Sequence, residues 1–146
     1  MPAREIISPE LHVLGTSKVT ISTATTTSFD FGTPNDIDLA SVVSTEPGYT
    51  YVHGDRVLVI LTASTAGTTD SLTWVIQDAD DNAGDIGTPA TAVTTGTLAV
   101  TTGDAFSQIS VKLQSGRPWL RVRVTSSGST DTFVCHCTVL GVPGVL

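Results

Sequence analysis

The strongest constraint on the fold is a two-residue alternation of apolar and polar side chains along most of the chain. On a β-strand, successive side chains point to opposite faces, so this period is typical of strands with one buried face, whereas a helix shows a period near 3.6 residues. The alternation is cleanest in residues 19–21, 72–76, 109–113, 120–124 and 133–139. The sequence therefore predicts an all-β chain.

The number and spacing of these segments indicate a sandwich. Residues 56–62 are apolar on both faces, which predicts a central strand covered on each side. Weaker strands are expected near residues 49–52 and 98–101, which brings the total to roughly eight strands at short, regular spacing. We expect an antiparallel, jelly-roll-like β-sandwich whose last three strands form a meander. An immunoglobulin-like sandwich is the alternative.

The chain of 146 residues is long enough for one hydrophobic core. Residues 1–15 match neither period, so we expect residues 1–15 to form an extended N-terminal arm and residues 16–146 to form a single β-sandwich domain. A frayed tail is the alternative, but we favour an arm held by an adjacent subunit. Its candidate contact residues are apolar: Ile6, Ile7, Leu11, Val13 and Leu14.

The charge balance argues against two classes of partner. Fourteen acidic residues and seven basic residues give a net charge of −7, which disfavours attraction to phosphate backbones and anionic lipid. No apolar run approaches the roughly eighteen residues of a membrane span, and Arg4, Glu5 and Glu10 stand where a secretory signal needs an apolar run. We therefore expect no nucleic-acid partner, no membrane partner, and a chain that is made and kept in a cytoplasm.

The two cysteines are expected to be structural. Cys135 and Cys137 share one face of a predicted strand about 7 Å apart, which is too far for a relaxed disulfide. His136 points to the opposite face, and the sequence has no second Cys or His pair at zinc-ligand spacing. We expect both thiols to be free and buried as small hydrophobes.

Motifs for catalysis are missing from the sequence. Gly-x-Ser-x-Gly, the phosphate-binding loop and the paired-glycine dinucleotide fingerprint do not occur. His12 and His53 have no sequence partner that would suggest a hydrolytic triad. We therefore expect a protein that is not an enzyme and that uses no cofactor.

An acidic segment has a spacing that resembles the start of a calcium-binding loop. Its residues are Asp78, Asp80, Asp81, Asn82 and Asp85. The helix-loop-helix type of site needs Gly and Glu at the sixth and twelfth places, where this chain has Ala83 and Pro89, so that type is excluded. A solvated hairpin with local hydrogen bonds is favoured, a looser calcium site stays open, and the first three aspartates are candidate interface residues.

Trp119, Arg121 and Arg123 alternate with an aliphatic row, so they point outward if that row faces the core. A surface tryptophan beside two arginines is typical of interfaces. A loop could instead cover this face, with the arginine stems lying across the indole, and the sequence leaves both readings open. With Arg117, these residues are the main basic concentration, which could meet an acidic partner or the acidic segment of a neighbouring copy.

From about residue 23 to residue 142 the chain resembles the small capsid cement, or decoration, proteins of tailed bacteriophages. The resemblance rests on the order of several blocks, none of which is catalytic. The blocks are a threonine-rich strand leading into Ser28-Phe29-Asp30-Phe31-Gly32, residues 56–63, Leu72-Thr73-Trp74-Val75-Ile76-Gln77-Asp78 with the acidic segment, Arg117-Pro118-Trp119-Leu120-Arg121-Val122-Arg123-Val124, and His136-Cys137-Thr138-Val139-Leu140-Gly141-Val142. The N-terminal arm and the Cys-His-Cys run look particular to this chain.

The resemblance implies a β-sandwich that assembles as trimers on the outside of an icosahedral shell and clamps neighbouring major capsid proteins. Its expected partners are the major capsid protein and further copies of itself. Its expected location is the exterior of the virion, after synthesis in the host cytoplasm. The alternative function is a carbohydrate- or receptor-binding module of a phage tail or surface protein, with Trp74 or Trp119 as the stacking platform.

Overall fold

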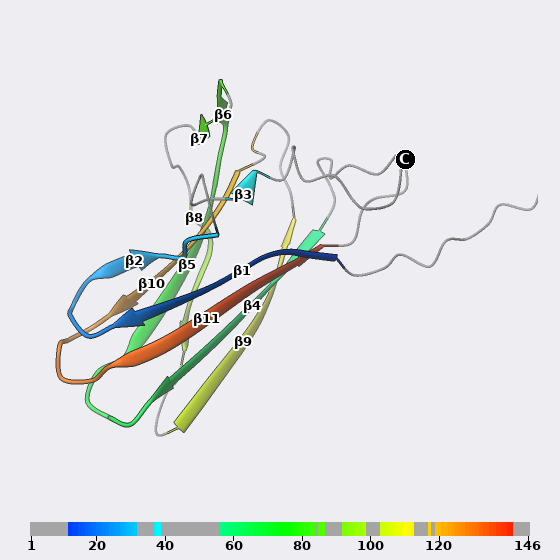
Figure 1. Cartoon of the computed structure of the whole chain (residues 1–146). Coiled ribbons are helices and arrows are strands. Elements are labelled where there is room, and N and C mark those ends of the chain that lie inside the picture. Colours follow the sequence, from blue (N-terminus) through cyan, green and yellow to red (C-terminus); the bar gives the residue numbers. More distant parts are fainter. Residues whose placement is uncertain are drawn as a thin grey trace, which may run out of the picture.

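In a computed structural model, the strands of the chain form two antiparallel sheets packed face to face (Figure 1). The structure describes residues 12–31, 37–38, 56–83, 85–86, 92–98, 103–112, 117 and 119–141. The described part of the chain contains no helix that could span a membrane.

The four-stranded sheet has the order β1 (His12–Ile21), β11 (Phe133–Gly141), β4 (Arg56–Thr65) and β9 (Gly103–Lys112). The five-stranded sheet has the order β2 (Thr26–Ser28), β10 (Trp119–Ser126), β5 (Leu72–Ala79) and β8 (Ala92–Leu98), with β3 (Ile37–Asp38) also paired to β10. A separate small hairpin pairs β6 (Asp81–Asn82) with β7 (Asp85–Ile86).

This strand order is that of a jelly roll, so the predicted fold class is confirmed. The chain passes from one sheet to the other between β1 and β2, β3 and β4, β4 and β5, β8 and β9, β9 and β10, and β10 and β11. The strands of the two halves correspond in pairs: β1 with β8, β2 with β9, β4 with β10, and β5 with β11. If each strand is replaced by its counterpart, the strand order of one sheet becomes that of the other. The sandwich therefore has an internal two-fold relation between its N-terminal and C-terminal halves.

The predicted meander of the last three strands is wrong. Strand β9 lies in the four-stranded sheet, β10 in the five-stranded sheet, and β11 in the four-stranded sheet again. The reason is that the connections from β9 to β10 and from β10 to β11 both cross between the sheets and do not reverse within one. Of the two weaker strands, the one expected near residues 98–101 lies earlier in the chain, as β8, and the one near residues 49–52 lies outside the described residues.

The core lies between the inner faces of the two sheets, where the alternation predicted it. Along β4, Val57, Val59 and Leu61 are 1%, 0% and 0% exposed. The expectation that this strand is covered on both sides is wrong, because Leu58 and Ile60 on its other face are only half-buried. Strand β4 is central within its sheet, but that sheet packs on its partner sheet through one face only.

Two loops that cross between the sheets hold each other through their aspartates. One carboxylate oxygen of Asp70 accepts hydrogen bonds from the backbone N–H groups of Thr130 and Asp131, both at 2.8 Å. One oxygen of Asp131 accepts hydrogen bonds from the N–H groups of Thr69 and Asp70, both at 2.7 Å. The four bonds form a reciprocal clamp between residues 66–71 and 127–132.

The clamp corresponds to a short internal repeat, Gly67-Thr68-Thr69-Asp70 and Gly128-Ser129-Thr130-Asp131, which the sequence analysis did not use. A Cβ atom at Gly67 would collide with the carboxylate of Asp131, and one at Gly128 would collide with that of Asp70. Glycine is therefore needed at both places, since each carboxylate lies directly against the opposite loop.

Gly96 of β8 gives a first stability test, because the indole of Trp74 lies against it. The two residues are opposite one another in the β5–β8 register, and a Cβ atom at Gly96 would lie 2.7 Å from Cε2 of the indole. We expect Gly96→Ala to lower the free energy of unfolding by about 1–3 kcal/mol through overpacking. Urea denaturation followed by tryptophan fluorescence measures this change.

The matched control is Thr95→Val, which changes an exposed residue of the same strand and keeps the β-branched shape. The control is expected to change stability by less than about 0.5 kcal/mol. Equal stability of Gly96→Ala and the wild type would show that the indole does not depend on this glycine.

Candidate functional site: the outer face of the four-stranded sheet

The side chains that point away from the core on the four-stranded sheet form a surface that we call the outer face. From β1 and β11 it comprises Val13, Thr16, Lys18, Thr20, Val134, His136, Thr138 and Leu140; from β4 and β9 it comprises Arg56, Leu58, Ile60, Thr62, Ser64, Asp104, Phe106, Gln108, Ser110 and Lys112. The pairing register arranges them in rows across the strands, and Leu140 stands between Val13 and Leu58 in one such row.

An apolar band crosses the outer face diagonally. Val13 and Phe106 are 64% and 62% exposed, and they are the large exposed hydrophobic side chains among the described residues. Half-buried apolar side chains lie between and beside them: Leu58, Ile60, Val134 and Leu140. A contiguous exposed apolar patch is typical of an interaction site.

A groove of about 420 Å³ lies at the Phe106 end of this band. The outer-face residues that line it are Thr62, Ser64, Asp104, Phe106, Val134 and His136. An aromatic ring is thus surrounded by two hydroxyls, a carboxylate and an imidazole. Such a groove can receive a projecting side chain of another protein, or a small polar ligand that stacks on the ring.

The outward prediction for Trp119 is wrong, and the alternative of a covered face is confirmed for this residue. Its side chain is only 1% exposed, although it lies on the face of β10 opposite the core cluster. At this end β10 pairs with both β3 and β5, so that Trp119 stands between Asp38 and Ala79, and Ala79 is also buried.

The arginines of β10 are likewise only partly accessible. Arg121 and Arg123 are half-buried. The Nε atom of Arg123 is buried and has no hydrogen-bond partner among the described residues. The predicted basic interface of Trp119, Arg121 and Arg123 is therefore not an open surface.

The acidic segment is bound by an arginine of the same chain. Asp78 is 7% exposed, and its carboxylate accepts a hydrogen bond of 2.6 Å from Nε of Arg117. Nη2 of the same guanidinium donates to the backbone oxygen of Asp78 at 2.9 Å, and Nη1 lies 4.0 Å from the exposed carboxylate of Asp80. Arg117 therefore pairs with the acidic segment of its own chain.

The rest of the acidic segment forms the expected hairpin, in which Asp81 pairs with Ile86 and Ala83 has a positive φ of 56°. Within the described residues, no three His, Cys, Asp or Glu side chains are grouped so that they could hold a metal ion. Of the three candidate interface aspartates, Asp78 is buried in the ion pair, Asp80 is exposed, and the side chain of Asp81 lies outside the description.

The N-terminal candidates divide between the strand and the undescribed residues. Residues 12–15, which the sequence analysis placed in the arm, belong to β1 and pair with β11. Val13 points to the outer face, while Leu14 packs against the core. A register shift between Val13 and Gly15 interrupts the alternation, so the sequence pattern did not show that this part of the chain belongs to the strand. Three further candidates, Ile6, Ile7 and Leu11, lie outside the described residues.

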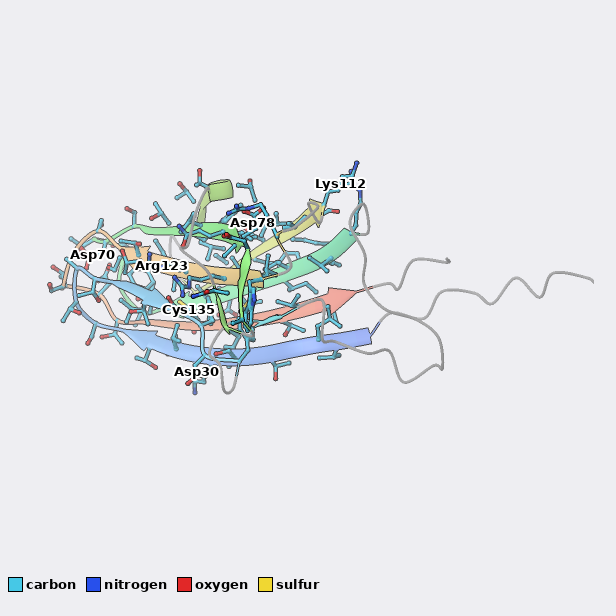
Figure 2. All side chains as sticks on the ribbon, turned by 90° about the horizontal axis from the view of Figure 1, so that it is seen from above. Asp30, Asp70, Asp78, Lys112, Arg123 and Cys135 are labelled. Atoms are coloured by element: carbon cyan, nitrogen blue, oxygen red, sulfur yellow. The ribbon has the colours of Figure 1, made fainter. Side chains whose placement is uncertain are left out.

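Both cysteines are free and buried in the core, and His136 is exposed on the other face, as predicted. Burial raises the pKa of the Cys135 thiol to about 11 and that of the Cys137 thiol to about 12. The reactive thiolate is therefore scarce at neutral pH. Figure 2 shows Cys135 in the interior of the sandwich, consistent with a packing role.

The shifted thiols predict low reactivity in the native state. We expect Ellman's reagent at pH 8 to label neither Cys135 nor Cys137 in the folded chain and both in urea. Their ordinary pKa is 9.0, and the folded values are higher. The stabilisation from keeping both thiols neutral is thus fully present below about pH 9 and is lost as the pH rises toward 11 to 12. Fast labelling of the native chain would contradict the buried placement.

No protein-family model matches the chain, and no curated protein matches it in sequence. Solved structures with some similarity include infectious bursal disease virus, Gt strain, at 11% identity and a TM-score of 0.45, covering 93% of this chain and 34% of the other. The cyanophage Pam1 capsid asymmetric unit gives 15% identity and a TM-score of 0.36, covering 92% and 86%.

A third similar structure is not viral. It is the Clostridium thermocellum xylanase 10B fragment with CBM22-1 and GH10 modules, complexed with xylohexaose, at 13% identity and a TM-score of 0.44. The alignment covers 89% of this chain and 26% of the xylanase chain, so this chain spans about a quarter of that protein.

Proposed function

We propose that the chain is a structural subunit that decorates the outside of a phage capsid and stabilises contacts between major capsid proteins. The observation that carries the proposal is the outer face, where Val13 and Phe106 expose more than half of their surface on a sheet of the jelly roll. The resemblance of residues 23–142 to capsid cement proteins supports it. We propose no catalytic role.

The physical basis is the burial of apolar surface between subunits. Each fully buried side chain of this size contributes about 1.5–3 kcal/mol, and a subunit that binds only the expanded shell shifts the shell toward that state. Each of the many copies adds one interface of modest affinity, so the shell gains stability without any covalent bond. A decoration subunit of this kind needs a stably folded domain and an exposed surface that binds the shell.

Association with further copies belongs to the same proposal. We infer a homotrimer in which the segment before β1 contacts a neighbouring subunit, through the apolar residues Ile6, Ile7 and Leu11. Since β1 begins at His12, removal of residues 1–11 is the clean deletion for this contact. The truncated chain is expected to keep its melting temperature and to lose its association.

Co-sedimentation tests the proposal. The full chain is mixed with expanded empty shells and, separately, with unexpanded procapsids of the same phage, and each mixture is pelleted. We expect the chain to pellet with the expanded shells and to stay in solution with procapsids. A chain that stays in the supernatant with both shells would contradict the proposed function.

A carbohydrate- or receptor-binding module is the second candidate function. Trp74 and Trp119 are 9% and 1% exposed, so neither can be the stacking platform that the sequence suggested. The observation that favours a sugar ligand is the groove, in which Phe106 lies with Asp104 and His136. Glycan-array binding that disappears in Phe106→Ser would support this function.

A further inference from the structure

We propose that the outer face docks on a protein surface that has an apolar centre and an acidic rim, with the Phe106 groove as its anchor. The inference rests on the proposed function, in which that surface belongs to the major subunit of the shell. The inference adds to that function which face of the chain binds the shell and which charge the bound surface carries.

The charge of the outer face is opposite to that of the rest of the chain. Its charged side chains are Lys18, Arg56, Lys112 and Asp104. With His136 neutral, three positive charges and one negative charge give a net charge of +2. The whole chain carries −7, so all other residues together carry −7 − 2 = −9. Opposite potentials guide association and align two partners, so this face fits an acidic surface.

The basic side chains lie around the apolar band. Arg56 and Lys112 are opposite one another in the β4–β9 register, at the far end of the face from the groove. Figure 2 shows Lys112 at the end of the sandwich opposite to Asp70. Lys18 is opposite His136 on the β1 side. All three basic residues are exposed and flank the apolar band, which runs from β1 to β9. Apolar surface bordered by charged side chains is typical of protein interfaces.

A second copy docked by the same face is the weaker occupant. A two-fold contact places the same patch against itself, so two surfaces of net charge +2 would meet. The outer face therefore favours a partner surface of opposite charge over the same face of a second copy. The groove supports this assignment, since a projecting side chain of the partner can enter beside Phe106 and cover the ring.

The test is rebinding to expanded shells that have been stripped of the protein. The wild type is compared with Phe106→Ser, with the double variant Lys18→Glu/Lys112→Glu, and with Thr97→Glu on the five-stranded sheet. Thr97 is exposed on β8 and serves as the matched control. Urea denaturation first establishes that each variant is folded.

We expect Phe106→Ser to raise the dissociation constant by about tenfold or more, as for a hot-spot residue. The charge-reversal variant is expected to bind more weakly and to lose most of the salt dependence of the wild type. Thr97→Glu is expected to bind as the wild type does, because it lies on the other side of the sandwich.

The outcomes separate the two proposals. If the wild type rebinds and Phe106→Ser rebinds equally well, the docking face is wrong while the proposed function stands. If the wild type does not rebind at all, the proposed function fails and the inference fails with it. An isolated oligomer that dissociates in Phe106→Ser would assign the face to a second copy, and a Phe106-dependent glycan would assign it to a sugar; either result overturns the inference.

Discussion

Asp131→Ala is expected to lower the free energy of unfolding by about 3 kcal/mol, because two backbone N–H groups lose a charged acceptor at once. The carboxylate is 6% exposed and accepts the N–H groups of Thr69 and Asp70 at 2.7 Å. Neither bond can be replaced from within the loop by an alanine side chain. Urea denaturation of the variant measures the loss, and Asp104→Ala, an exposed carboxylate on β9, is the control.

The reciprocal geometry also predicts that the effects of the two aspartates on stability are coupled. Asp70 holds the segment that carries Asp131, and Asp131 holds the segment that carries Asp70. The double variant Asp70→Ala/Asp131→Ala is therefore expected to lose less than the sum of the two single losses, with a coupling of about 0.5–3 kcal/mol. Strict additivity, or a loss for Asp131→Ala no larger than that of Asp104→Ala, would show that the clamp does not stabilise the fold.

Trp119→Ala is expected to cost about 3–5 kcal/mol of stability in the isolated chain, the range for truncation of a buried aromatic side chain. The indole is 1% exposed, so its removal leaves a cavity in the free protein, not only in an assembly. Thermal and urea unfolding of the purified chain measure the loss.

Phe106→Ala is the matched comparison, because Phe106 is 62% exposed in the same chain. We expect it to keep stability within about 0.5 kcal/mol of the wild type while it weakens docking. The two variants thus distinguish a loss of stability, expected for Trp119→Ala, from a loss of docking, expected for Phe106→Ala. An unchanged stability for Trp119→Ala would contradict its buried placement and return it to the list of interface candidates.

The strands and the core were predictable because burial on one face of a sheet imposes a period of two on the sequence. Leu72, Trp74 and Ile76, for example, all lie in the core as their alternation indicated. The strand order was not predictable from this pattern, since it depends on loops that cross between the sheets. The repeat of Gly67–Asp70 in Gly128–Asp131 was the available signal for these crossings.

The candidate site shows a second limit of the alternation. It assigned Trp119 to the face of β10 away from the core, but a period cannot tell whether that face is covered by other parts of the chain. Phe106 was missed because the strand was predicted to begin near residue 109, whereas β9 begins at Gly103. Continued backwards from Ile109, the period of two places Phe106 on the same face as Gln108 and Ser110, and an aromatic side chain on this polar face was the signal that would have found it.

Cryo-electron microscopy of the intact phage particle tests the central claim most directly. We expect density for the jelly roll on the outside of the shell, with the four-stranded sheet turned toward the major capsid protein and a side chain of that protein beside Phe106. A particle without this density, or one in which the five-stranded sheet faces the shell, would contradict the account.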